Sequence, residues 1–327
     1  MKKKKISKWK IIGLSILGVL ILGIAGFAYE YYQLQPKNHF KTVPVVSNGK
    51  NDSKDLPETA NVNDPVFNVL LIGSDERKGQ NIGHSDSMML VHVDLKQQKY
   101  NAISIPRDTR VHLDGYGYTK LTSVQYIIQA TQGPKKGVEA AVTAVSELTG
   151  VPINYYVETN YGGFQSMVEA VGGIDMNVPF EVKLTHPWYG ENKNKVISPG
   201  VHSFDGKMVT EIVHERYSLK NGEFGRQKLQ EEALKGVAKK ALSPSNITNL
   251  PSLVKSIDDF VIATNMSTSD MLSLGLSAKN FNPDKQLTYY QIPGEGKRMY
   301  DDILKNTNYQ LVVDQQKIDE IVSTNFQ

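Results

Sequence analysis

The chain has 327 residues, of which 37 are Lys or Arg and 34 are Asp or Glu, and it contains no cysteine. The absence of cysteine excludes disulfide bonds, thiolate metal sites, a cysteine nucleophile and lipid attachment through a thiol. Six of the basic residues are lysines within residues 1–10, so the rest of the chain holds 31 basic against 34 acidic residues. That slightly acidic remainder excludes a basic surface of the kind that binds nucleic acid.

The N-terminus predicts a single transmembrane helix over residues 11–29, a stretch of 19 residues without a charge. A helix of that length spans roughly 28 Å, close to the ~30 Å hydrocarbon core of a bilayer. The lysines of residues 1–10 predict a cytoplasmic tail, which leaves everything after Glu30 outside the cytoplasm. A cleaved signal peptide is the alternative, with a small-x-small pattern at residues 26–28, but the apolar stretch exceeds the usual ~7–15 residues.

The remainder of the chain divides into a polar segment and an α/β region. Residues 30–64 lack apolar periodicity and predict an extracytoplasmic linker. After it we expect a catalytic domain over 65–244 and a C-terminal α/β extension over 245–327, packed on the same domain. The expected strands are 67–72, 87–93, 100–105, 155–158, 174–178 and 286–291, and the expected helices are 120–130, 136–148, 161–171, 206–217, 226–241, 250–259, 269–277 and 314–323. This alternation predicts a mixed central β-sheet flanked by helices. Two further segments read as a loop (218–223) and a polar insertion with His186, Pro187 and Trp188 (183–199).

Charged residues stand at the ends of the first three predicted strands. Asp75 follows the first strand, Asp86 precedes the second, and Arg107 follows the third. Ligand sites of α/β proteins lie at strand ends, so this succession indicates a shared polar cleft. The alternative is that these are ordinary loop residues where strands enter solvent.

Two predicted helices add candidates for the same cleft. His214 and Arg216 end the first, and Arg226 and Gln230 lie one turn apart on the second. Arginines with carboxylates suit a phosphate or pyrophosphate, and hard carboxylate oxygens favour Mg²⁺ or Mn²⁺ over zinc. Salt bridging along a solvated helix face, for example between Arg226 and Glu231, is the alternative.

A series of separated motifs occurs in one order between Pro65 and Ala241. They are GSD-x-R (73–77), SDSMMLV (85–91), SIPRDTRV (104–111), Lys120, LTGVPINYYV (148–157), GF (163–164), VGGIDMNVPF (171–180) and HER…GEFGR…Q (214–230). In this collinear order the chain resembles the LytR-CpsA-Psr family. The predicted N-terminal anchor is similar to the plan of that family.

The resemblance implies a phosphotransferase that moves a glycopolymer, of the teichoic acid or capsular polysaccharide type, from a polyprenyl-pyrophosphate carrier to peptidoglycan. It implies a single-pass protein of a Gram-positive cell membrane with its domain outside, partnered by the bilayer and not by nucleic acid. The residues that match catalytic positions are Asp75, Asp86, Arg107 and Arg216, with Asp75 and Asp86 as ligands of Mg²⁺ or Mn²⁺. The matched pyrophosphate-binding positions are His84, Arg107, Arg110, Lys120, His214, Arg216, Arg226 and Gln230. An apolar tunnel for the prenyl chain is expected among 142–148 and 164–171. The general base is left unassigned.

The chain departs from the family where His84 and His214 replace arginines, and Thr122, Glu223 and Leu229 also differ from the common residues. Histidine has an ordinary pKa near 6.5, so the two exchanges predict activity that falls more steeply above neutral pH than in relatives with arginine. A non-catalytic lipid-pyrophosphate binder or envelope regulator, and a lipid pyrophosphatase, are the alternative functions. The family is often labelled a transcriptional regulator, but only about ten residues are expected to face the cytoplasm.

Overall fold

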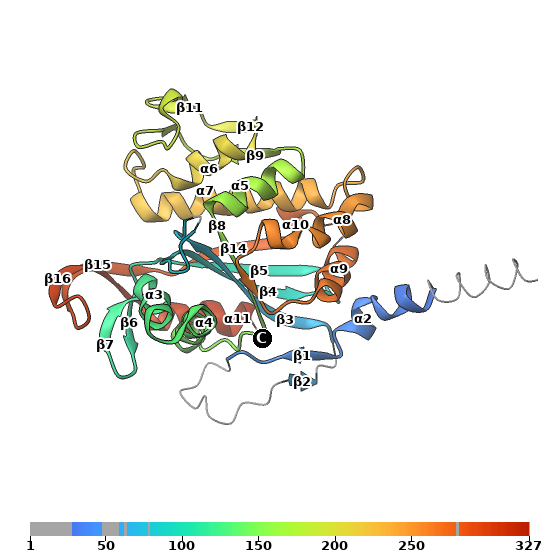
Figure 1. Cartoon of the computed structure of the whole chain (residues 1–327), viewed down its shortest axis with the longest axis horizontal. Coiled ribbons are helices and arrows are strands. Elements are labelled where there is room, and N and C mark those ends of the chain that lie inside the picture. The colour runs from blue at the N-terminus through green and yellow to red at the C-terminus, as the bar shows by residue number, and fades with distance from the viewer. Residues whose placement is uncertain (1–27, 48–58, 62–63, 78, 279–280, 327) are drawn as a thin grey trace, which may run out of the picture.

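A mixed six-stranded β-sheet lies at the centre of the protein in a computed structural model that describes residues 28–47, 59–61, 64–77, 79–278 and 281–326 (Figure 1). The strands lie in the order β13 (Ala263–Thr264), β8 (Tyr155–Asn160), β3 (Val66–Ser74), β4 (Ser85–Asp94), β5 (Lys99–Ile105) and β14 (Leu287–Gln291). β3 pairs in parallel with β8, as β5 does with β14, and the other neighbours are antiparallel. The predicted mixed central β-sheet with flanking helices is confirmed.

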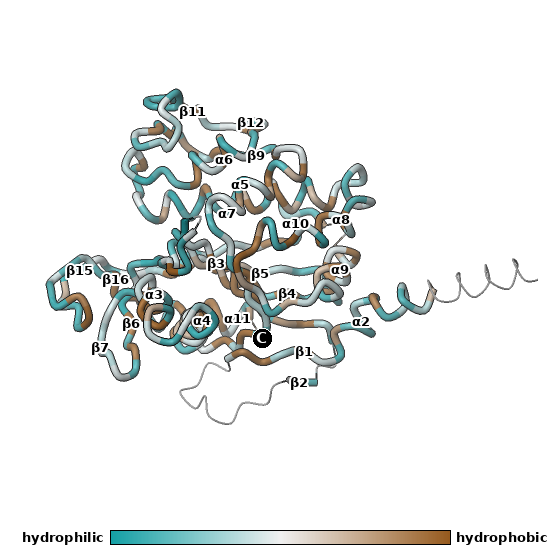
Figure 2. The backbone as a smooth tube through the Cα atoms, viewed as in Figure 1, coloured by the Kyte–Doolittle hydropathy of each residue, from teal (hydrophilic) through white to brown (hydrophobic). Residues whose placement is uncertain are grey.

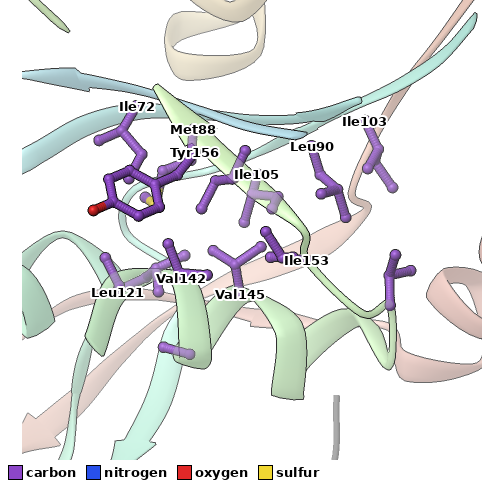
Figure 3. Close-up of a cluster of buried hydrophobic side chains, with 14 of the residues drawn as sticks. Ile72, Met88, Leu90, Ile103, Ile105, Leu121, Val142, Val145, Ile153 and Tyr156 are labelled. Carbon is purple, nitrogen blue, oxygen red and sulfur yellow. The ribbon is translucent and has the colours of Figure 1, made fainter. Parts of the chain in front are cut away.

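One face of the sheet packs against α3 (Leu121–Gln132), α4 (Pro134–Thr149) and α11 (Gln315–Asn325) (Figure 1). Because successive strand residues point to opposite faces, Leu70 and Ile72 of β3 belong to the same apolar core. Ile72 points toward the side of α4 that carries Val142 and Val145 (Figure 3). The tube in Figure 2 shows its hydrophobic stretches gathered at these central strands and the helices against them. With both faces covered, β3 is apolar almost throughout, as expected of a central strand.

The other face of the sheet carries a second layer with its own apolar core. It consists of α5 (Tyr161–Ala170), α6 (Gly206–His214) and α7 (Gly222–Ala241) with the paired strands β9 (Ile174–Val178) and β12 (Gly200–Phe204). α7 lies along β9, where a Cβ on Gly236 would approach the Asp175 carbonyl to 2.8 Å, so only glycine fits that position. The predicted insertion 183–199 continues this layer as β10 (Val182–Lys183), the 3₁₀ turn η2 (Gly190–Asn192) and β11 (Val196–Ile197).

Two helix boundaries differ from the sequence prediction. α6 was expected to run to Tyr217 but ends at His214, and α7 begins at Gly222 inside the expected loop 218–223. The cause is Glu215, whose carboxylate accepts hydrogen bonds from the backbone N–H groups of Arg216 and Ser218. Such local side-chain bonds compete with continued helix, so the chain turns away after α6.

The segment predicted as a linker is structured in part, so that prediction is wrong for residues 36–47. It forms α2 (Pro36–His39) and β1 (Thr42–Pro44), which pairs with β2 (Thr59–Asn61). Phe40 and Val43 are each only 1% exposed, and the Phe40 ring lies 4.7 Å from that of Phe67 on β3. These two apolar side chains, together with hydrogen bonds between Ser47 and Ile153, dock the segment on a core that other elements supply. Two apolar residues are too few to produce a periodic pattern in the sequence.

The C-terminal region, 245–327, is woven into the sheet, because its strands β13 and β14 form the two edges. Its remaining elements are η3 (Ile247–Asn249), α8 (Leu250–Lys255), η4 (Ile257–Asp259), α9 (Thr268–Ser277), α10 (Pro283–Gln286) and the hairpin β15 (Gly294–Asp301)–β16 (Asn306–Val313). This hairpin lies against a second one, β6 (Arg110–Leu113)–β7 (Gly117–Lys120) (Figure 1). Neither hairpin was expected from the sequence, because both are rich in charged and polar residues.

The predicted transmembrane segment 11–29 falls almost wholly outside the described residues, which begin at Ala28. Among the helices that the structure describes, none combines the length and the apolar character needed to cross a bilayer.

The docking of residues 36–47 predicts a stability effect. Phe40→Ala should lower the free energy of unfolding by about 3–5 kcal/mol, the usual cost of deleting a buried phenyl ring. Denaturant titration of the purified chain measures this, with the exposed neighbour Lys41→Ala as the control, expected within about 0.5 kcal/mol of the parent. A loss below 1 kcal/mol for Phe40→Ala would mean that the segment is a linker after all.

Candidate active site

The candidate site lies at the edge of the central sheet that is formed by strand ends, where β3 and β5 end and the antiparallel β4 begins. The pairing of β3 with β4 is irregular between Gly73 and Ser74, and a Cβ on Gly73 would collide with Ser87 Oγ. This close approach brings the loop after β3, with Asp75, beside the start of β4, with Asp86. Arg107 follows β5 directly, so the three predicted strand-end residues do gather.

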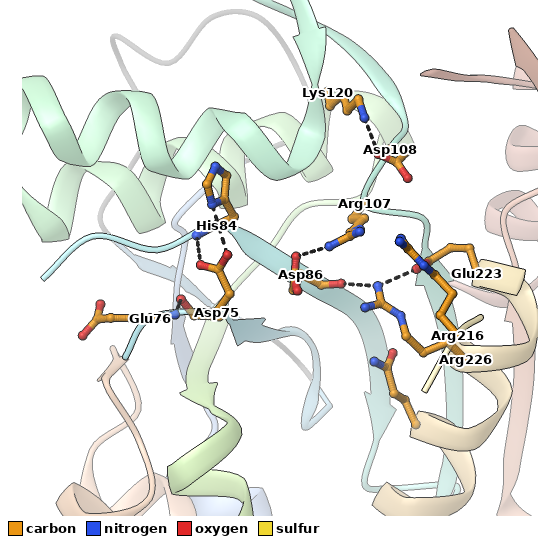
Figure 4. Close-up of polar contacts among 12 residues, drawn as sticks. Asp75, Glu76, His84, Asp86, Arg107, Asp108, Lys120, Arg216, Glu223 and Arg226 are labelled. Atoms are coloured by element: carbon orange, nitrogen blue, oxygen red, sulfur yellow. Dashed lines mark hydrogen bonds and ion pairs between the residues drawn. The ribbon is translucent and has the colours of Figure 1, made fainter. Parts of the chain in front are cut away.

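Asp86 is the centre of the polar contacts (Figure 4). Its Oδ1 accepts a hydrogen bond from Arg107 Nη1 at 2.5 Å, and its backbone carbonyl accepts one from Arg226 Nη2 at 2.7 Å. The same Nη2 donates to Glu223 Oε1 at 2.8 Å. Arg226 is only 3% exposed, so its charge is held by these partners rather than by water.

The surroundings of Arg107 keep it charged, and the cluster leaves hydrogen-bond donors for a ligand. Burial alone would lower the pKa of Arg107, but the Asp86 carboxylate, helped by Asp108 and Glu223, raises it above its ordinary value. Within the described part of the chain, Arg107 Nε, Arg226 Nε and Glu223 Oε2 are buried without a hydrogen-bond partner. Buried polar atoms are normally paired, and guanidinium N–H groups suit phosphate oxygens. The cluster therefore has the donors that a pyrophosphate requires.

Asp75 and His84 form a second pair at the same edge (Figure 4). Asp75 Oδ1 accepts from the His84 backbone N–H at 2.6 Å, and Oδ2 lies 3.2 Å from His84 Nδ1. The His84 ring stacks on Tyr126 with centroids 4.4 Å apart, so the imidazole is fixed on both sides. His84 thus lies beside the predicted metal ligand rather than beside Arg226.

The donor set at this edge is compatible with a hard divalent cation that is shared with a phosphate. No group of three or more His, Asp or Glu side chains suited to a metal occurs among the described residues. Asp75 and Asp86 are both partly exposed at the edge of the sheet, and Mg²⁺ commonly binds one or two carboxylates together with substrate phosphate oxygens. The pair fits that arrangement, with the remaining ligands left to phosphate and water.

The other predicted residues divide between this cluster and elsewhere. Lys120 lies close by and pairs with Asp108 at 2.8 Å (Figure 4), and the Arg216 guanidinium lies 5.1 Å from the centre of the exposed Tyr217 ring. Arg110 is turned away from the cluster, because its Nη1 donates to Gln310 Oε1 and to the Tyr300 carbonyl of the β15–β16 hairpin. Its assignment to pyrophosphate stays a prediction, and the hairpin that binds its guanidinium here was not evident from the sequence.

An apolar cavity adjoins the cluster, between the β3–β4–β8 face of the sheet and helices α5, α6 and α7. The cavity and the open solvent at its mouth together comprise about 850 Å³ of space not filled by atoms, and the lining includes Leu71, Met89, Phe164, Met167 and Gln230. Residues 164–171 thus contribute to it as expected. Residues 142–148 do not, because α4 packs into the core on the opposite face of the sheet.

Tyr161 joins the cavity to the polar cluster and was not recognised from the sequence. It lines the cavity at the start of α5, and burial, with a further contribution from Asp86, raises the pKa of its phenol to about 12. Its position directly after a strand is the only signal that the sequence offers, because tyrosine carries no charge at neutral pH.

His214 behaves differently from the arginine that it replaces. Burial lowers the pKa of His214 and the nearby Arg226 lowers it further, against the opposing carboxylates of Glu211, Asp86 and Glu215. The free protein therefore holds a neutral imidazole there at neutral pH, whereas an arginine at this position would be charged.

Comparison with known proteins follows this geometry. A profile of the LytR_cpsA_psr family matches residues 30–327. The chain belongs to this family. It is 32% identical over 301 residues to a protein of Bacillus cereus named polyisoprenyl-teichoic acid–peptidoglycan teichoic acid transferase TagU, covering 92% of this chain and 91% of that one.

Solved structures of this family share the fold. Bacillus subtilis TagV superposes with a TM-score of 0.65 at 26% identity, over 79% of this chain and 95% of that one. TagT bound to LIIa-WTA superposes with a TM-score of 0.62 at 26% identity, over 79% and 89% of the two chains. The region matched by the family profile begins at residue 30, which agrees with the docking of residues 36–47 on the core.

The surroundings of His214 predict its titration. In the ligand-free protein its NMR-detected midpoint should lie below pH 6.5, and Arg226→Gln should move the midpoint upward by removing a nearby positive charge. Between the ordinary pKa of histidine near 6.5 and the lower midpoint of His214, the folded state binds fewer protons than the unfolded state. His214 therefore makes the free energy of unfolding fall as the pH drops through this range. A midpoint at or above 6.5 in the parent protein would contradict the assignment.

Proposed function

We propose that this protein transfers a glycopolymer of the teichoic acid type from a polyprenyl-pyrophosphate carrier to peptidoglycan. The observation that carries the proposal is the joining of a buried arginine–carboxylate cluster to an apolar cavity at Tyr161. A prenyl-linked pyrophosphate has the same two parts in direct succession, one strongly anionic and one a hydrocarbon chain.

The relatives support this assignment of substrate. Relatives aligned over nine-tenths of this chain carry the name of a polyisoprenyl-teichoic acid–peptidoglycan teichoic acid transferase. Two solved structures show the relative TagT bound to LIIa-WTA and to LI-WTA. A capsular polysaccharide would present the same pyrophosphate and prenyl groups, so the polymer itself is a matter for the transfer assay.

The arginines of the cluster bind the donor and stabilise the transition state in the proposed reaction. Arg107 and Arg226 bind the pyrophosphate oxygens and stabilise the charge that develops on them, which is the main requirement of phosphoryl transfer. A hydroxyl oxygen of a peptidoglycan sugar attacks the phosphorus that bears the glycopolymer. The bond from that phosphorus to the bridging oxygen breaks, prenyl phosphate leaves with the electron pair, and the hydroxyl proton is released.

Asp75 and Asp86 would hold Mg²⁺ or Mn²⁺ together with the phosphates, and the ion when bound supplies positive charge to the phosphoryl oxygens. Arg107 orients the Asp86 carboxylate through its short ion pair, and Arg226 fixes the backbone of the same residue. Arg216, in the loop that follows α6, would bind the second phosphate.

We also propose that residues 11–29 anchor the protein in the cell membrane with its domain outside. A prenyl-linked donor cannot leave the bilayer, so a cleft that uses it must stay near the membrane surface. The lysine-rich tail and the uncharged segment after it support this orientation.

The first test of this function measures transfer directly. Purified full-length protein in detergent, a labelled lipid-linked teichoic acid precursor, Mg²⁺ and peptidoglycan oligomers should yield labelled peptidoglycan. Arg107→Ala and Asp86→Asn should each lower the rate at least ~100-fold, the usual cost of removing a group that stabilises transition-state charge. EDTA should abolish transfer, and added Mg²⁺ or Mn²⁺ should restore it.

The exposed Lys297→Ala on β15 serves as the control and should retain the parent rate. Release of polymer to water in place of transfer would identify a lipid pyrophosphatase. Binding of the precursor without any turnover would identify a carrier-binding or regulatory protein. Either result overturns the transferase.

The second test concerns location. Full-length protein should remain in the membrane fraction after washing with alkaline carbonate, and deletion of residues 1–29 should release it. A reporter fused to the C-terminus should be accessible from outside intact cells. Recovery of the full chain in the soluble fraction would contradict the anchor.

A further inference from the structure

An exposed aromatic surface borders the candidate site and takes no part in the chemistry described so far. Trp188, in the insertion 183–199, is 47% exposed. Its ring centroid lies 4.3 Å from that of His214 and 4.6 Å from that of Tyr161, whose ring meets it edge-on. Tyr217, 69% exposed, follows shortly after His214 in the chain, and its ring centroid lies 4.5 Å from that of His186. The rings of Trp188 and His214 thus flank Tyr161, which lines the cavity.

The loop that carries Trp188 is fixed by two buried carboxylates. Glu211 of α6 accepts hydrogen bonds from the backbone N–H groups of Trp188 at 3.0 Å and Tyr189 at 2.8 Å. Glu215 accepts from the backbone N–H of Thr185 at 2.6 Å and from its hydroxyl at 3.0 Å. A buried carboxylate destabilises the fold unless it is well paired. Both carboxylates would lose their hydrogen bonds if the loop moved, so the loop is held in one conformation.

A tryptophan that is rigidly held and half exposed has a specific use. A large apolar ring in water is unfavourable, and contiguous exposed aromatic surface marks an interaction site. The negative face of an aromatic ring attracts the weakly positive C–H groups that line one face of a pyranose ring. Because the loop is fixed before the ligand arrives, little conformational entropy is lost on binding.

The position of the rings selects the ligand. Tyr161 lines the cavity beside the phosphate-binding cluster, and the rings of Trp188 and His214 lie against it. The charges of Asp86 and Arg226 act on both Tyr161 and His214, in agreement with that position. In the donor the first sugar is bonded directly to the pyrophosphate. With the phosphates at the arginines and the prenyl chain in the cavity, that sugar has to lie beside the cluster, where these rings are.

We propose that Trp188, supported by Tyr161 and His214, is a subsite that stacks against the pyranose ring of the sugar joined to the donor pyrophosphate. This inference rests on the proposed function. It assigns the insertion 183–199 to donor recognition, so that the protein distinguishes a loaded carrier lipid from a spent one.

The test compares two ligands that differ only in the sugar: farnesyl pyrophosphate and farnesyl-pyrophosphoryl-N-acetylglucosamine. With full-length protein in detergent, Trp188→Ala should weaken binding of the sugar lipid about tenfold, a typical aromatic stacking effect, and leave binding of farnesyl pyrophosphate within twofold. Trp188→Phe should retain most of the affinity. Glu211→Gln keeps every aromatic residue but weakens the hydrogen bonds that fix the loop, so it should weaken binding of the sugar lipid by a smaller factor.

Fluorescence provides a second readout. The chain has two tryptophans, so Trp9→Phe leaves Trp188 as the only one. Its emission should shift on addition of the sugar lipid and not on addition of farnesyl pyrophosphate. Tyr309→Ala, an equally exposed aromatic on β16, is the matched control and should bind both lipids as the parent does.

Three results would overturn the proposal in distinguishable ways. Equal weakening of both lipids by Trp188→Ala would make the loop a support of the phosphate site. An unchanged affinity for both lipids with a raised KM for peptidoglycan oligomers would assign the rings to the acceptor. Failure of the parent protein to bind either lipid would instead refute the proposed function on which the subsite depends.

Discussion

The ion pair between Arg107 and Asp86 is the interaction on which the arrangement of the site depends. It joins the end of β5 to the start of β4, and the carbonyl of the same aspartate binds Arg226 of α7. One residue therefore ties the sheet to the helical layer above it. In the low-dielectric interior such contacts are strong only when every partner is present, so the position of the helices and the charge state of the cluster are linked.

The sequence predicted the parts of this arrangement that depend on local patterns. Short apolar strands separated by charged loops were enough to predict a mixed sheet and to bring Asp75, Asp86 and Arg107 to one edge of it. The spacing of Arg226 and Gln230 likewise placed both on one face of a helix. These features follow from periodicity and from where strands end, which a single sequence contains.

Other features depend on contacts between distant segments, and no local pattern reveals them. Phe40 is buried by Phe67 and Tyr155, which are distant from it in the sequence. Its neighbours in the sequence are mostly polar, and for that reason residues 36–47 resemble a linker. Arg110 is captured by a hairpin some 200 residues away in the chain. The lowered pKa of His214 arises from its burial beneath Trp188 and the charge of Arg226, neither of which is adjacent to it in sequence.

The two edges of the central sheet have a consequence for how the chain acquires its structure. β13 and β14 lie after residue 260, yet they cover β8 and β5, which are made more than a hundred residues earlier. Until the last quarter of the chain is present, both outer strands keep unpaired backbone groups that can pair with another molecule. Such long-range pairing also slows folding. The protein therefore completes its fold late, and during synthesis its incomplete form is the state most exposed to aggregation and proteolysis.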